Sequence, residues 1–423
     1  MKIQLPYGRG VLETEIPDAR LQAVFHSRLD EYCPSLGEAE LVRQAMASPI
    51  GSPTLRQLAQ GKQKITIIAS DHTRPVPSRI ILPLMLEEIR QGNPQAEITI
   101  LIATGCHRET TQAELEAKFG PEILAKEYIE IHDCNNEDSL VFLDTLPSGG
   151  RLIVNRTAAQ ADLLVAEGFI EPHFFAGYSG GRKSVFPGVA SRISVHANHC
   201  SAFIAHPKAR CGILDGNPIH RDMLFAAKRT GLAYIVNVVI NSRKEVVAAF
   251  AGDCDAAHRQ GTVFLDAICR SAPQPADIVL TSNNGYPLDQ NIYQAVKGMT
   301  TAEATCRDGG VIILAAQCED GIGGDSFYQL MRSASSPQAL LERFLALPPE
   351  ETLPDQWQAQ IFARILSHHP VVFISDVPDK VVEAFHMTPA HSIQEALSKA
   401  DRLLGRNDGR IVVIPEGISN IIR

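Results

Sequence analysis

The sequence predicts an α/β protein of two domains with mainly parallel sheets. Short runs rich in Ile, Val and Leu recur along the chain, and polar loops and amphipathic segments separate them. Near-continuous apolar strands that alternate with helices are typical of parallel sheet covered on both faces. The length of 423 residues suits two domains of ordinary size.

The elements can be placed along the chain from their patterns. Residues 2–17 alternate between apolar and polar side chains around a glycine-containing turn, which predicts a β-hairpin. Strands are expected at 64–69, 97–103, 161–166, 276–281, 310–316, 371–375 and 410–415. Helices are expected at 78–91, 112–126, 217–230 and 381–404. Asn217 followed by Pro218 is a typical helix start, because asparagine caps the first N–H groups and proline fits the first turn.

A domain boundary is expected near 255–275. One helix is predicted over 255–270, and the proline-containing stretch 271–277 then leads into a new strand. We therefore expect an N-terminal α/β domain at 1–265 and a smaller C-terminal α/β domain at 275–423, and the final strand could pack on either domain.

The composition excludes several classes of protein. The chain is 45% hydrophobic and 21% charged, as in ordinary globular proteins. It has no apolar run long enough to span a membrane and no signal-peptide pattern, so we expect a cytoplasmic protein without a membrane partner. A net charge of -9 argues against binding to nucleic acid. The nine cysteines include no Cys-x-x-Cys pair, which argues against structural zinc and suits reduced thiols.

Chemically active residues gather directly after predicted strands. Ligands of open α/β sheets bind beyond the carboxyl ends of the strands, so these loops are where a site is expected. The loops are Asp71-His72-Thr73-Arg74-Pro75, Thr104-Gly105-Cys106-His107-Arg108, residues 171–184 and Ser282-Asn283-Asn284-Gly285-Tyr286-Pro287. They are basic in an acidic protein, which predicts a cleft for a small anionic substrate or cofactor.

The glycine-rich stretch 177–184 is the strongest of these features. Glycines let the backbone approach an anion, and Arg182 and Lys183 add positive charge. A P-loop would need glycine directly before the Lys183-Ser184 pair, where arginine stands here, and the G-x-G-x-x-G fingerprint is absent. The stretch therefore predicts an anion- or cofactor-binding loop of another kind, and a plain surface turn is the alternative.

Two pairs of histidines suggest different chemistry. His107 and His173 follow two different strands, and two imidazoles on one substrate would form an acid–base pair near neutral pH. His196 and His199 are three residues apart, which would place them on one face of a helix, as in some metal sites. Either pair could instead be structural, because a lone histidine is more often a satisfied polar residue than a catalyst.

Two cationic residues could hold a carboxylate. Arg74 offers a planar fork of donors and Lys297 a point charge. On a helix, Tyr293, Gln294 and Lys297 would share a face. The alternative for Lys297 is an ordinary solvated lysine.

These motifs together resemble the nickel-dependent lactate racemase family, over the whole chain and at nearly the same length. The matching motifs are Asp71-His72-Thr73-Arg74-Pro75, Thr104-Gly105-Cys106-His107-Arg108, Glu171-Pro172-His173-Phe174-Phe175-Ala176-Gly177 with Ser179-Gly180-Gly181-Arg182-Lys183, His199, and Tyr293-Gln294-Ala295-Val296-Lys297. The resemblance implies two α/β domains with the active site in the cleft between them. The domain at 1–265 would carry the cofactor and the catalytic histidines, and the domain at 275–423 would contribute substrate contacts.

The resemblance also implies a cofactor and a role for each motif residue. The cofactor is a nickel pincer nucleotide, a pyridinium-3,5-dithiocarboxylate-type mononucleotide that separate maturation enzymes make. Lys183 would attach it covalently through a thioamide, and His199 would be the protein ligand to nickel. The expected cofactor-binding residues are Lys183, Asp71, Gly177, Ser179, Gly180, Gly181 and Arg182. His107 and His173 would be the catalytic bases, and Arg74, Tyr293, Gln294 and Lys297 would bind substrate.

The implied activity is that of an isomerase, a racemase of D- and L-2-hydroxy acids, with lactate as the first choice. One histidine would take the hydroxyl proton while hydride passes to the cofactor, and return of hydride to the other face would invert the carbon. Other 2-hydroxy acids, such as malate, larger aliphatic or aromatic acids and sugar acids, are the alternatives, because pocket shape sets that choice. A metal-dependent hydrolase or lyase that uses His196 and His199, or an anion-sensing binding protein, is a more distant alternative; the H-E-x-x-H pattern of metalloproteases is absent.

Overall fold

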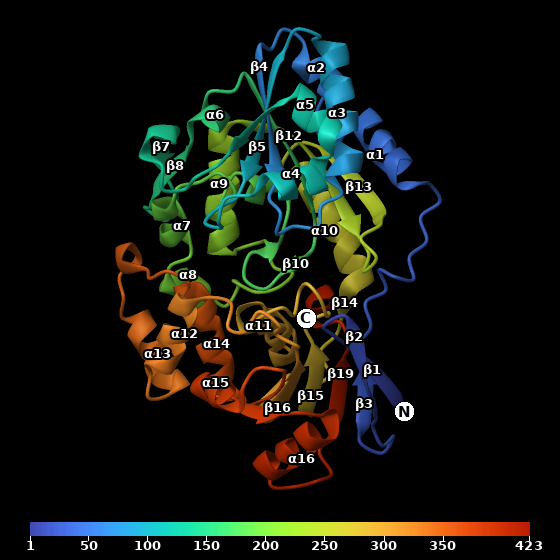
Figure 1. The fold of residues 1–423 in the computed structure, drawn as a ribbon, viewed down its shortest axis with the longest axis vertical. Helices are drawn as coiled ribbons and strands as arrows, with labels where there is room; N and C mark the ends of the chain where they lie inside the picture. Colours follow the sequence, from blue (N-terminus) through green and yellow to red (C-terminus); the bar gives the residue numbers. More distant parts are fainter. The chain divides into compact units, whose positions relative to one another are not determined.

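The computed structural model describes residues 1–423, which form two compact units (Figure 1). Unit 1 comprises Met1–Ser27, His199–Gly212 and Cys269–Arg423, and unit 2 comprises Arg28–Asn198 and Ile213–Ile268. Each unit contains one six-stranded sheet with helices and its own hydrophobic core. The prediction of two α/β domains with mainly parallel sheets is confirmed.

The sheet of unit 2 runs in the order β13-β12-β9-β4-β5-β6. Its strands are β4 (Lys64–Ser70), β5 (Glu97–Ala103), β6 (Tyr128–Ile131), β9 (Leu163–Phe169), β12 (Leu232–Ile240) and β13 (Val246–Gly252). All neighbouring strands are parallel except β12 and β13. The carboxyl ends of β4, β5 and β9 therefore meet at one edge. The sequence pattern predicted these three strands, whereas β6, β12 and β13 were not predicted.

Local chemistry explains one helix start and one helix end in unit 2. The helices of unit 2 are α1 (Glu38–Ala47), α2 (Leu55–Ala59), α3 (Ser78–Gly92), α4 (Gln112–Phe119), α5 (Pro121–Lys126), α6 (Arg156–Ala159), α7 (Arg192–Asn198), α9 (Pro218–Thr230) and α10 (Ala256–Cys269). Asn217 caps α9 by accepting from the N–H of Ile219, as its sequence predicts. The single helix expected at 112–126 is instead two helices, because Gly120 has a φ of 83° and ends α4.

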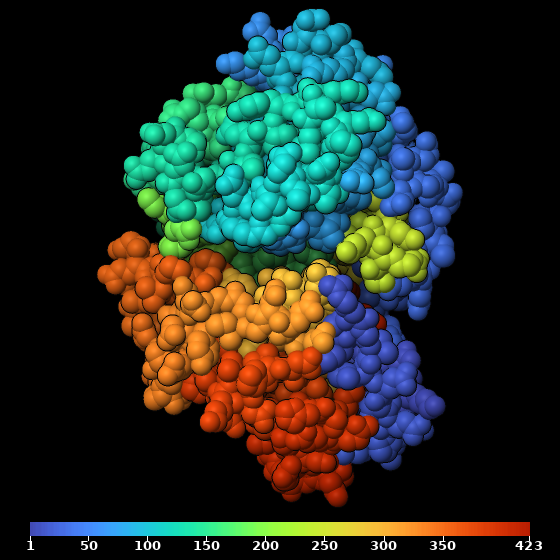
Figure 2. All heavy atoms as spheres, viewed as in Figure 1, coloured from blue at the N-terminus to red at the C-terminus, as the bar shows by residue number.

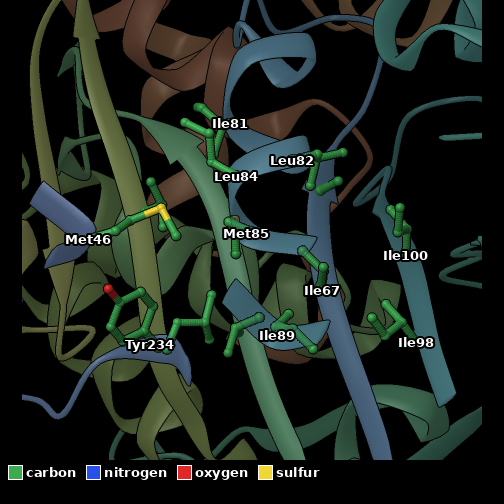
Figure 3. Packing of buried hydrophobic residues seen from close by; sticks show 14 of the residues in the cluster. Met46, Ile67, Ile81, Leu82, Leu84, Met85, Ile89, Ile98, Ile100 and Tyr234 are labelled. Atoms are coloured by element: carbon green, nitrogen blue, oxygen red, sulfur yellow. The ribbon is translucent and has the colours of Figure 1, made fainter. Parts of the chain in front are cut away.

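The core of unit 2 forms where α3 packs on the sheet. Ile81, Met85 and Ile89 are one helical turn apart and fully buried, so one face of α3 meets the apolar side chains of β4 and β5 (Figure 3). Tyr234 of β12 lies in the same cluster. Because α3 covers this face of the sheet, the strand residues beneath it are apolar.

The sheet of unit 1 is wholly parallel, in the order β18-β17-β16-β15-β19-β3. Its strands are β3 (Leu21–Val24), β15 (Ala276–Ser282), β16 (Cys306–Ala315), β17 (Val371–Ile374), β18 (Thr388–Ala390) and β19 (Ile411–Ile414). Residues 1–27, which the sequence analysis placed in the N-terminal domain, group with the C-terminal segment because β3 pairs with β19. Figure 2 shows this N-terminal segment, in dark blue, against the red C-terminal part of unit 1.

Most helices of unit 1 were not predicted from the sequence, and the one that was predicted, at 381–404, differs in the structure. The helices of unit 1 are α8 (Ser201–Ala205), α11 (Ile292–Glu303), α12 (Asp325–Arg332), α13 (Pro337–Leu345), α14 (Gln356–His368), α15 (Asp379–Ala384) and α16 (Ile393–Leu404). The single helix expected at 381–404 is wrong: β18 separates α15 from α16. Pro389 sits within β18 on the edge of the sheet, where the missing N–H costs no ladder bond, and proline would have broken a helix there.

Four two-stranded sheets complete the fold. They pair β1 (Lys2–Tyr7) with β2 (Gly10–Glu15), β7 (Leu140–Thr145) with β8 (Arg151–Asn155), β10 (Pro172–His173) with β11 (Gly177–Tyr178), and β14 (Arg270–Ser271) with β20 (Ile421–Ile422). The predicted N-terminal hairpin is confirmed as β1 and β2. None of the helices combines the length and the apolar character that crossing a membrane requires.

The hydroxyl of Tyr234 gives a test of the core of unit 2. It is buried and has no hydrogen-bond partner, so it contributes a desolvation cost without a compensating bond. We expect Tyr234→Phe to leave the free energy of unfolding unchanged or to raise it by up to about 1 kcal/mol. Ile67→Ala, in the same cluster, should lower it by about 2–5 kcal/mol. Urea unfolding followed by circular dichroism measures both, and a clear loss of stability in Tyr234→Phe would contradict this reading of the core.

Candidate functional site

A cavity of about 150 Å³ opens in unit 2 at the carboxyl ends of β4, β5 and β9. It lies where the strand-end loops were expected to converge. Its polar and charged lining residues are Ser70, Asp71, Arg74, Thr104, Cys106, His107, Glu167, Ser179, Lys183 and Ser184. Residues from four separate segments of unit 2 therefore meet around one space.

Asp71 and His107 form a close polar pair at this cavity. Nδ1 of His107 lies 2.7 Å from Oδ2 of Asp71. The other carboxylate oxygen, Oδ1, accepts from the backbone N–H of Thr73 at 3.1 Å and from its hydroxyl at 2.6 Å. This arrangement assigns the proton to Nδ1 of His107 and leaves Nε2 as the basic nitrogen. The side chain of His107 is 45% exposed, whereas that of Asp71 is 2% exposed, so a buried anion orients an accessible imidazole.

The environment of Asp71 keeps it ionised. Burial alone would raise its pKa, but the hydrogen bond and charge of His107, with the charge of Arg74 and a hydrogen bond from Thr73, lower the pKa to about 2. Arg74 is held beside the pair, since its Nη1 donates to the hydroxyl of Thr73 at 3.1 Å. At neutral pH the cavity thus contains a fixed negative charge that is already engaged by hydrogen bonds.

The glycine-rich loop brings Lys183 to the cavity. Gly180 and Gly181 have φ values of 75° and 54°, which non-glycine residues rarely adopt. A Cβ at Gly180 would also come within 2.7 Å of the carbonyl of Phe169. The chain then enters a short 3-10 helix, Gly181–Ser184, in which the backbone of Lys183 donates to Gly180 and accepts from Gly188. Close packing therefore requires glycine at position 180, and the resulting turn places Lys183 in the lining of the cavity.

Arg182 does not line the cavity, although the sequence analysis grouped it with the cofactor-binding residues. Its side chain is wholly buried and turns back into its own loop. Nη1 donates to the carbonyl of Tyr178 at 2.8 Å, Nη2 to that of Ala176 at 2.7 Å, and Nε to Nδ1 of His220 at 3.1 Å. Burial lowers the pKa of Arg182 to about 9, which still leaves a cation at neutral pH. Its observed contacts fix the loop backbone.

The remaining predicted loop residues have structural contacts as well. Ser179 lines the cavity, and its hydroxyl joins the carbonyl of Phe169 to the N–H of Glu171. Gly177 and Gly181 do not line it: a Cβ at Gly177 would meet the carbonyl of Ile213 at 2.4 Å, and one at Gly181 would meet the ring of His258.

His173 lies in unit 2 but outside the cavity lining. It belongs to the short strand β10, opposite Gly177 of β11. Its ring stacks on Phe174 and meets Phe175 edge-on, with centroids 5.1 and 4.6 Å apart. The N–H of Ala176 donates to Nδ1 at 3.3 Å, so the neutral ring carries its proton on Nε2. His173 is thus oriented by its own loop.

The substrate residues predicted on a helix face are on α11 of unit 1. Tyr293, Gln294 and Lys297 are half-buried between fully buried neighbours, as expected for one face of a helix. Asn283, at the end of β15, fixes this helix, because its Oδ1 accepts from Gly298 and its Nδ2 donates to the carbonyl of Gln294. The side chain of Asn283 is therefore used to hold the backbone of α11 against the end of β15.

His199 follows α7 and is not part of it, because the helix ends at Asn198. The expected helical face shared with His196 is therefore not formed. His199 is 4% exposed and belongs to unit 1, where its ring lies 5.2 Å from that of Trp357 on α14, edge to face. In neither unit do three His, Cys, Asp or Glu side chains converge as a metal site.

Comparison with known proteins identifies the family. The profile of the Lactate racemase N-terminal domain matches residues 7–212, and that of the Lactate racemase C-terminal domain matches residues 271–422. The chain belongs to the lactate racemase family. Family membership makes it an enzyme of the isomerase class, a racemase.

Named relatives and solved structures agree over the full length. The lactate racemase of Thermoanaerobacterium thermosaccharolyticum is 52% identical and that of Lactiplantibacillus plantarum 47%, each over 100% of this chain and 99% of the relative. The apoprotein structure of the former matches with a TM-score of 0.97 over 100% of both chains. A Thermotoga maritima protein matches with a TM-score of 0.67 at 17% identity, over 93% of this chain and 100% of that one, which shows a shared fold alone.

The structure of this racemase family member thus brings Asp71, Arg74, His107, Ser179, Gly180 and Lys183 to one cavity. His173 is in the same unit but not in the lining, and the residues of α11 and His199 are in unit 1. Sequence reasoning missed Thr73 and Glu167. A hydroxyl two residues after Asp71 was a signal for Thr73, whereas an acidic residue inside an apolar strand was the signal for Glu167.

The lowered pKa of Asp71 predicts a pH-dependent contribution to stability. A carboxylate with a pKa of about 2 in the folded chain and 3.8 in the unfolded chain stabilises the fold above pH 4, and this is lost as the pH falls toward 2. We expect Asp71→Asn to lower the free energy of unfolding by roughly 2 kcal/mol at pH 7, and by less at pH 3. Urea unfolding at several pH values tests this, with the exposed Asp138→Asn as control. A loss that does not change with pH would show that packing, and not the charge, is responsible.

Proposed function

We propose that this chain interconverts the D and L forms of a 2-hydroxy acid, with lactate as the first substrate. The observation that carries the proposal is the Asp71–His107 pair at a cavity that also contains Lys183. The two relatives named lactate racemase, at 52% and 47% identity over the full length, support lactate as the substrate. A larger or more polar 2-hydroxy acid is the nearest alternative, because a single methylene or hydroxyl changes selectivity only modestly in an apolar pocket.

His107 is suited to take the hydroxyl proton of the substrate. Its Nδ1–H is held by Asp71, so Nε2 has the lone pair that accepts the proton. The ionised Asp71 then stabilises the imidazolium that forms, because the two charges are 2.7 Å apart and Asp71 is shielded from water. Asp71 acts through His107, which makes it a positioning residue in this scheme.

A second base is needed because the hydroxyl oxygen of the opposite enantiomer lies on another side of the carbon. We assign this role to His173. In the structure its Nδ1 accepts from the N–H of Ala176, so Nδ1 is the basic nitrogen of the neutral ring, and proton uptake by His173 would replace that hydrogen bond. In either direction a neutral histidine accepts the hydroxyl proton, and the other histidine, which enters the step protonated, returns its proton to the oxygen of the planar keto acid. Proton transfer of this kind contributes about 10²–10⁴-fold to a rate.

Residues of the chain fit the nickel pincer nucleotide of the family. The cavity offers the amine of Lys183, the guanidinium of Arg74 and a buried carboxyl oxygen of Glu167 without a protein partner. Lys183 would form the thioamide attachment, and His199 would ligate nickel. Asp71, Ser179 and Gly180 would contact the nucleotide, with Gly177, Gly181 and Arg182 shaping the loop. When bound, the group supplies the acceptor for the hydride of the substrate, which avoids a carbanion.

The substrate carboxylate needs cationic and polar partners. Arg74 beside the Asp71–His107 pair offers a planar pair of donors. Lys297, Gln294 and Tyr293 on one face of α11 complete the proposed set. These contacts would hold the α-carbon of the substrate in position between the two histidines. Such positioning lowers the activation barrier, because the reacting groups are already oriented.

The maturation enzymes that make the cofactor are the expected protein partners. The decisive experiment is the intact mass of the chain after co-expression with those enzymes and nickel, with peptide mapping. An adduct on Lys183 with stoichiometric nickel would support the proposal, and a chiral assay over several 2-hydroxy acids would then give the substrate. An unmodified chain that still turns over a substrate would overturn it.

Replacing Lys183 tests the attachment directly. We expect Lys183→Ala and Lys183→Arg to carry no adduct and to lose turnover, because neither side chain can form the thioamide. The arginine variant keeps the positive charge and so separates charge from covalent attachment. Intact mass and the chiral assay on the same samples measure the result, and turnover by Lys183→Arg would refute the role of the lysine.

Replacing the two histidines tests the two-base scheme. We expect His107→Ala and His173→Ala each to slow racemisation about 10²–10⁴-fold starting from either enantiomer. The exposed His391→Ala, in unit 1, should behave as the wild type. Initial rates from pure D- and pure L-substrate measure the effect. A variant at position 107 or 173 that racemises at the normal rate would rule out that residue as a base.

A further inference from the structure

Glu167 is a buried acid at the cavity to which the proposed reaction assigns no proton transfer. It lies on β9 of unit 2 between β4 and β12 and is 2% exposed. One carboxyl oxygen, Oε1, accepts three hydrogen bonds: from the N–H of Ser70 at 3.1 Å, from its hydroxyl at 3.2 Å, and from the hydroxyl of Ser78 at 2.9 Å. Oε1 is thus fully occupied by the end of β4 and the start of α3.

The second oxygen, Oε2, is buried and has no hydrogen-bond partner in the protein. Leaving such an atom unpaired costs about 1–3 kcal/mol, so buried polar atoms of this kind usually have a partner. Glu167 is also one of the residues that line the cavity. Because Ser70 and Ser78 engage Oε1, Oε2 is the oxygen that remains for a ligand in that cavity.

The surroundings decide the charge of Glu167. Burial raises its pKa, and the charge of Lys118 and the hydrogen bonds of Ser78 and Ser70 only partly oppose that effect. In the neutral acid the proton belongs on Oε2, since Oε1 already accepts three bonds. A protonated Oε2 would present an O–H donor to the cavity, whereas an ionised Oε2 would leave a buried negative oxygen with no donor beside it.

The charges of the lining select the ligand group. Arg74 and Lys183 are cationic and line the same cavity. Asp71, the ionised acid of the lining, is engaged by His107 and Thr73. An anionic oxygen would be attracted by the cations and would need donors, whereas a second carboxylate would repel it.

We propose that Glu167 is a ligand-binding residue, a neutral carboxylic acid whose Oε2–H donates a hydrogen bond to an anionic oxygen of a phosphate or carboxylate group in this cavity. The inference rests on the proposed function only for the identity of the natural ligand, the nucleotide cofactor. The phosphate or carboxylate group would be recognised by the Oε2–H donor together with Arg74 and Lys183, which line the same cavity.

The test uses the full-length apoprotein and isothermal titration calorimetry. Nicotinamide mononucleotide carries a phosphate and no carboxylate, and nicotinate carries a carboxylate and no phosphate, so the two probes distinguish the sources of the anionic oxygen. We expect one of them to bind the wild type. Glu167→Gln should bind it within about twofold, because the amide oxygen can accept from the two serines while the NH₂ replaces the O–H. Glu167→Met should bind about tenfold more weakly or worse.

Controls separate the ligand contact from stability. Ser78→Ala removes a donor to Oε1 only, and it should lower the unfolding temperature while leaving probe affinity within about twofold. If Glu167→Met fails to fold, the infrared difference spectrum of the wild type on probe addition, with Glu167→Gln as blank, replaces it. A shift in the band of a protonated carboxyl is then expected.

Four results would overturn the inference. They are a tenfold loss of affinity in Glu167→Gln, unchanged affinity in Glu167→Met, an ionised carboxylate band in the infrared spectrum, and binding of neither probe by the wild type. Failure of the proposed function is seen separately, as the absence of an adduct on Lys183 in the co-expressed chain, so the two failures are distinguishable.

Discussion

The buried guanidinium of Arg182 holds the loop on which the candidate site depends. It donates to the carbonyls of Ala176 and Tyr178, which a glycine-rich loop could not otherwise satisfy away from water. No carboxylate pairs with it; its neighbours are His220 and His258, whose pKa values burial and the charge of Arg182 lower, to about 3 for His220 and well below the ordinary value for His258. Neutral imidazoles can contact this cation without charge repulsion. The hydrogen bonds of Arg182 thus fix the loop that carries Lys183.

The sequence predicted the parts of the fold and site that depend on local pattern. Strands such as β4 and β5 are continuous apolar runs, and the rule that ligands bind beyond parallel strands placed Asp71 and His107 at one edge before any geometry was available. The match of motifs to the family supplied chemical roles that spacing alone could not. What the residue pattern contributed by itself was the location, a basic set of loops in an acidic chain.

The features that escaped prediction depend on contacts between distant segments. Nothing near Arg182 in the sequence indicates that it turns inward, because its partner His220 is 38 residues away. The pairing of β3 with β19 joins residues almost 400 positions apart and could not be read from either strand. Glu167 stands in an apolar run, and only its neighbours Ser70 and Ser78 explain how an acid is tolerated there. Local pattern determines elements, whereas long-range packing determines their partners.

The place of β3 has a consequence for the order in which the chain folds during synthesis. β3 (Leu21–Val24) is synthesised before the segments of unit 2, whereas its partner β19 (Ile411–Ile414) is synthesised after them. Unit 2 can assemble in between, since its segments all lie within residues 28–268. The β3 segment therefore has no partner strand while unit 2 forms. Its backbone N–H and C=O groups remain unpaired, and open to pairing with other chains, until β19 has been synthesised.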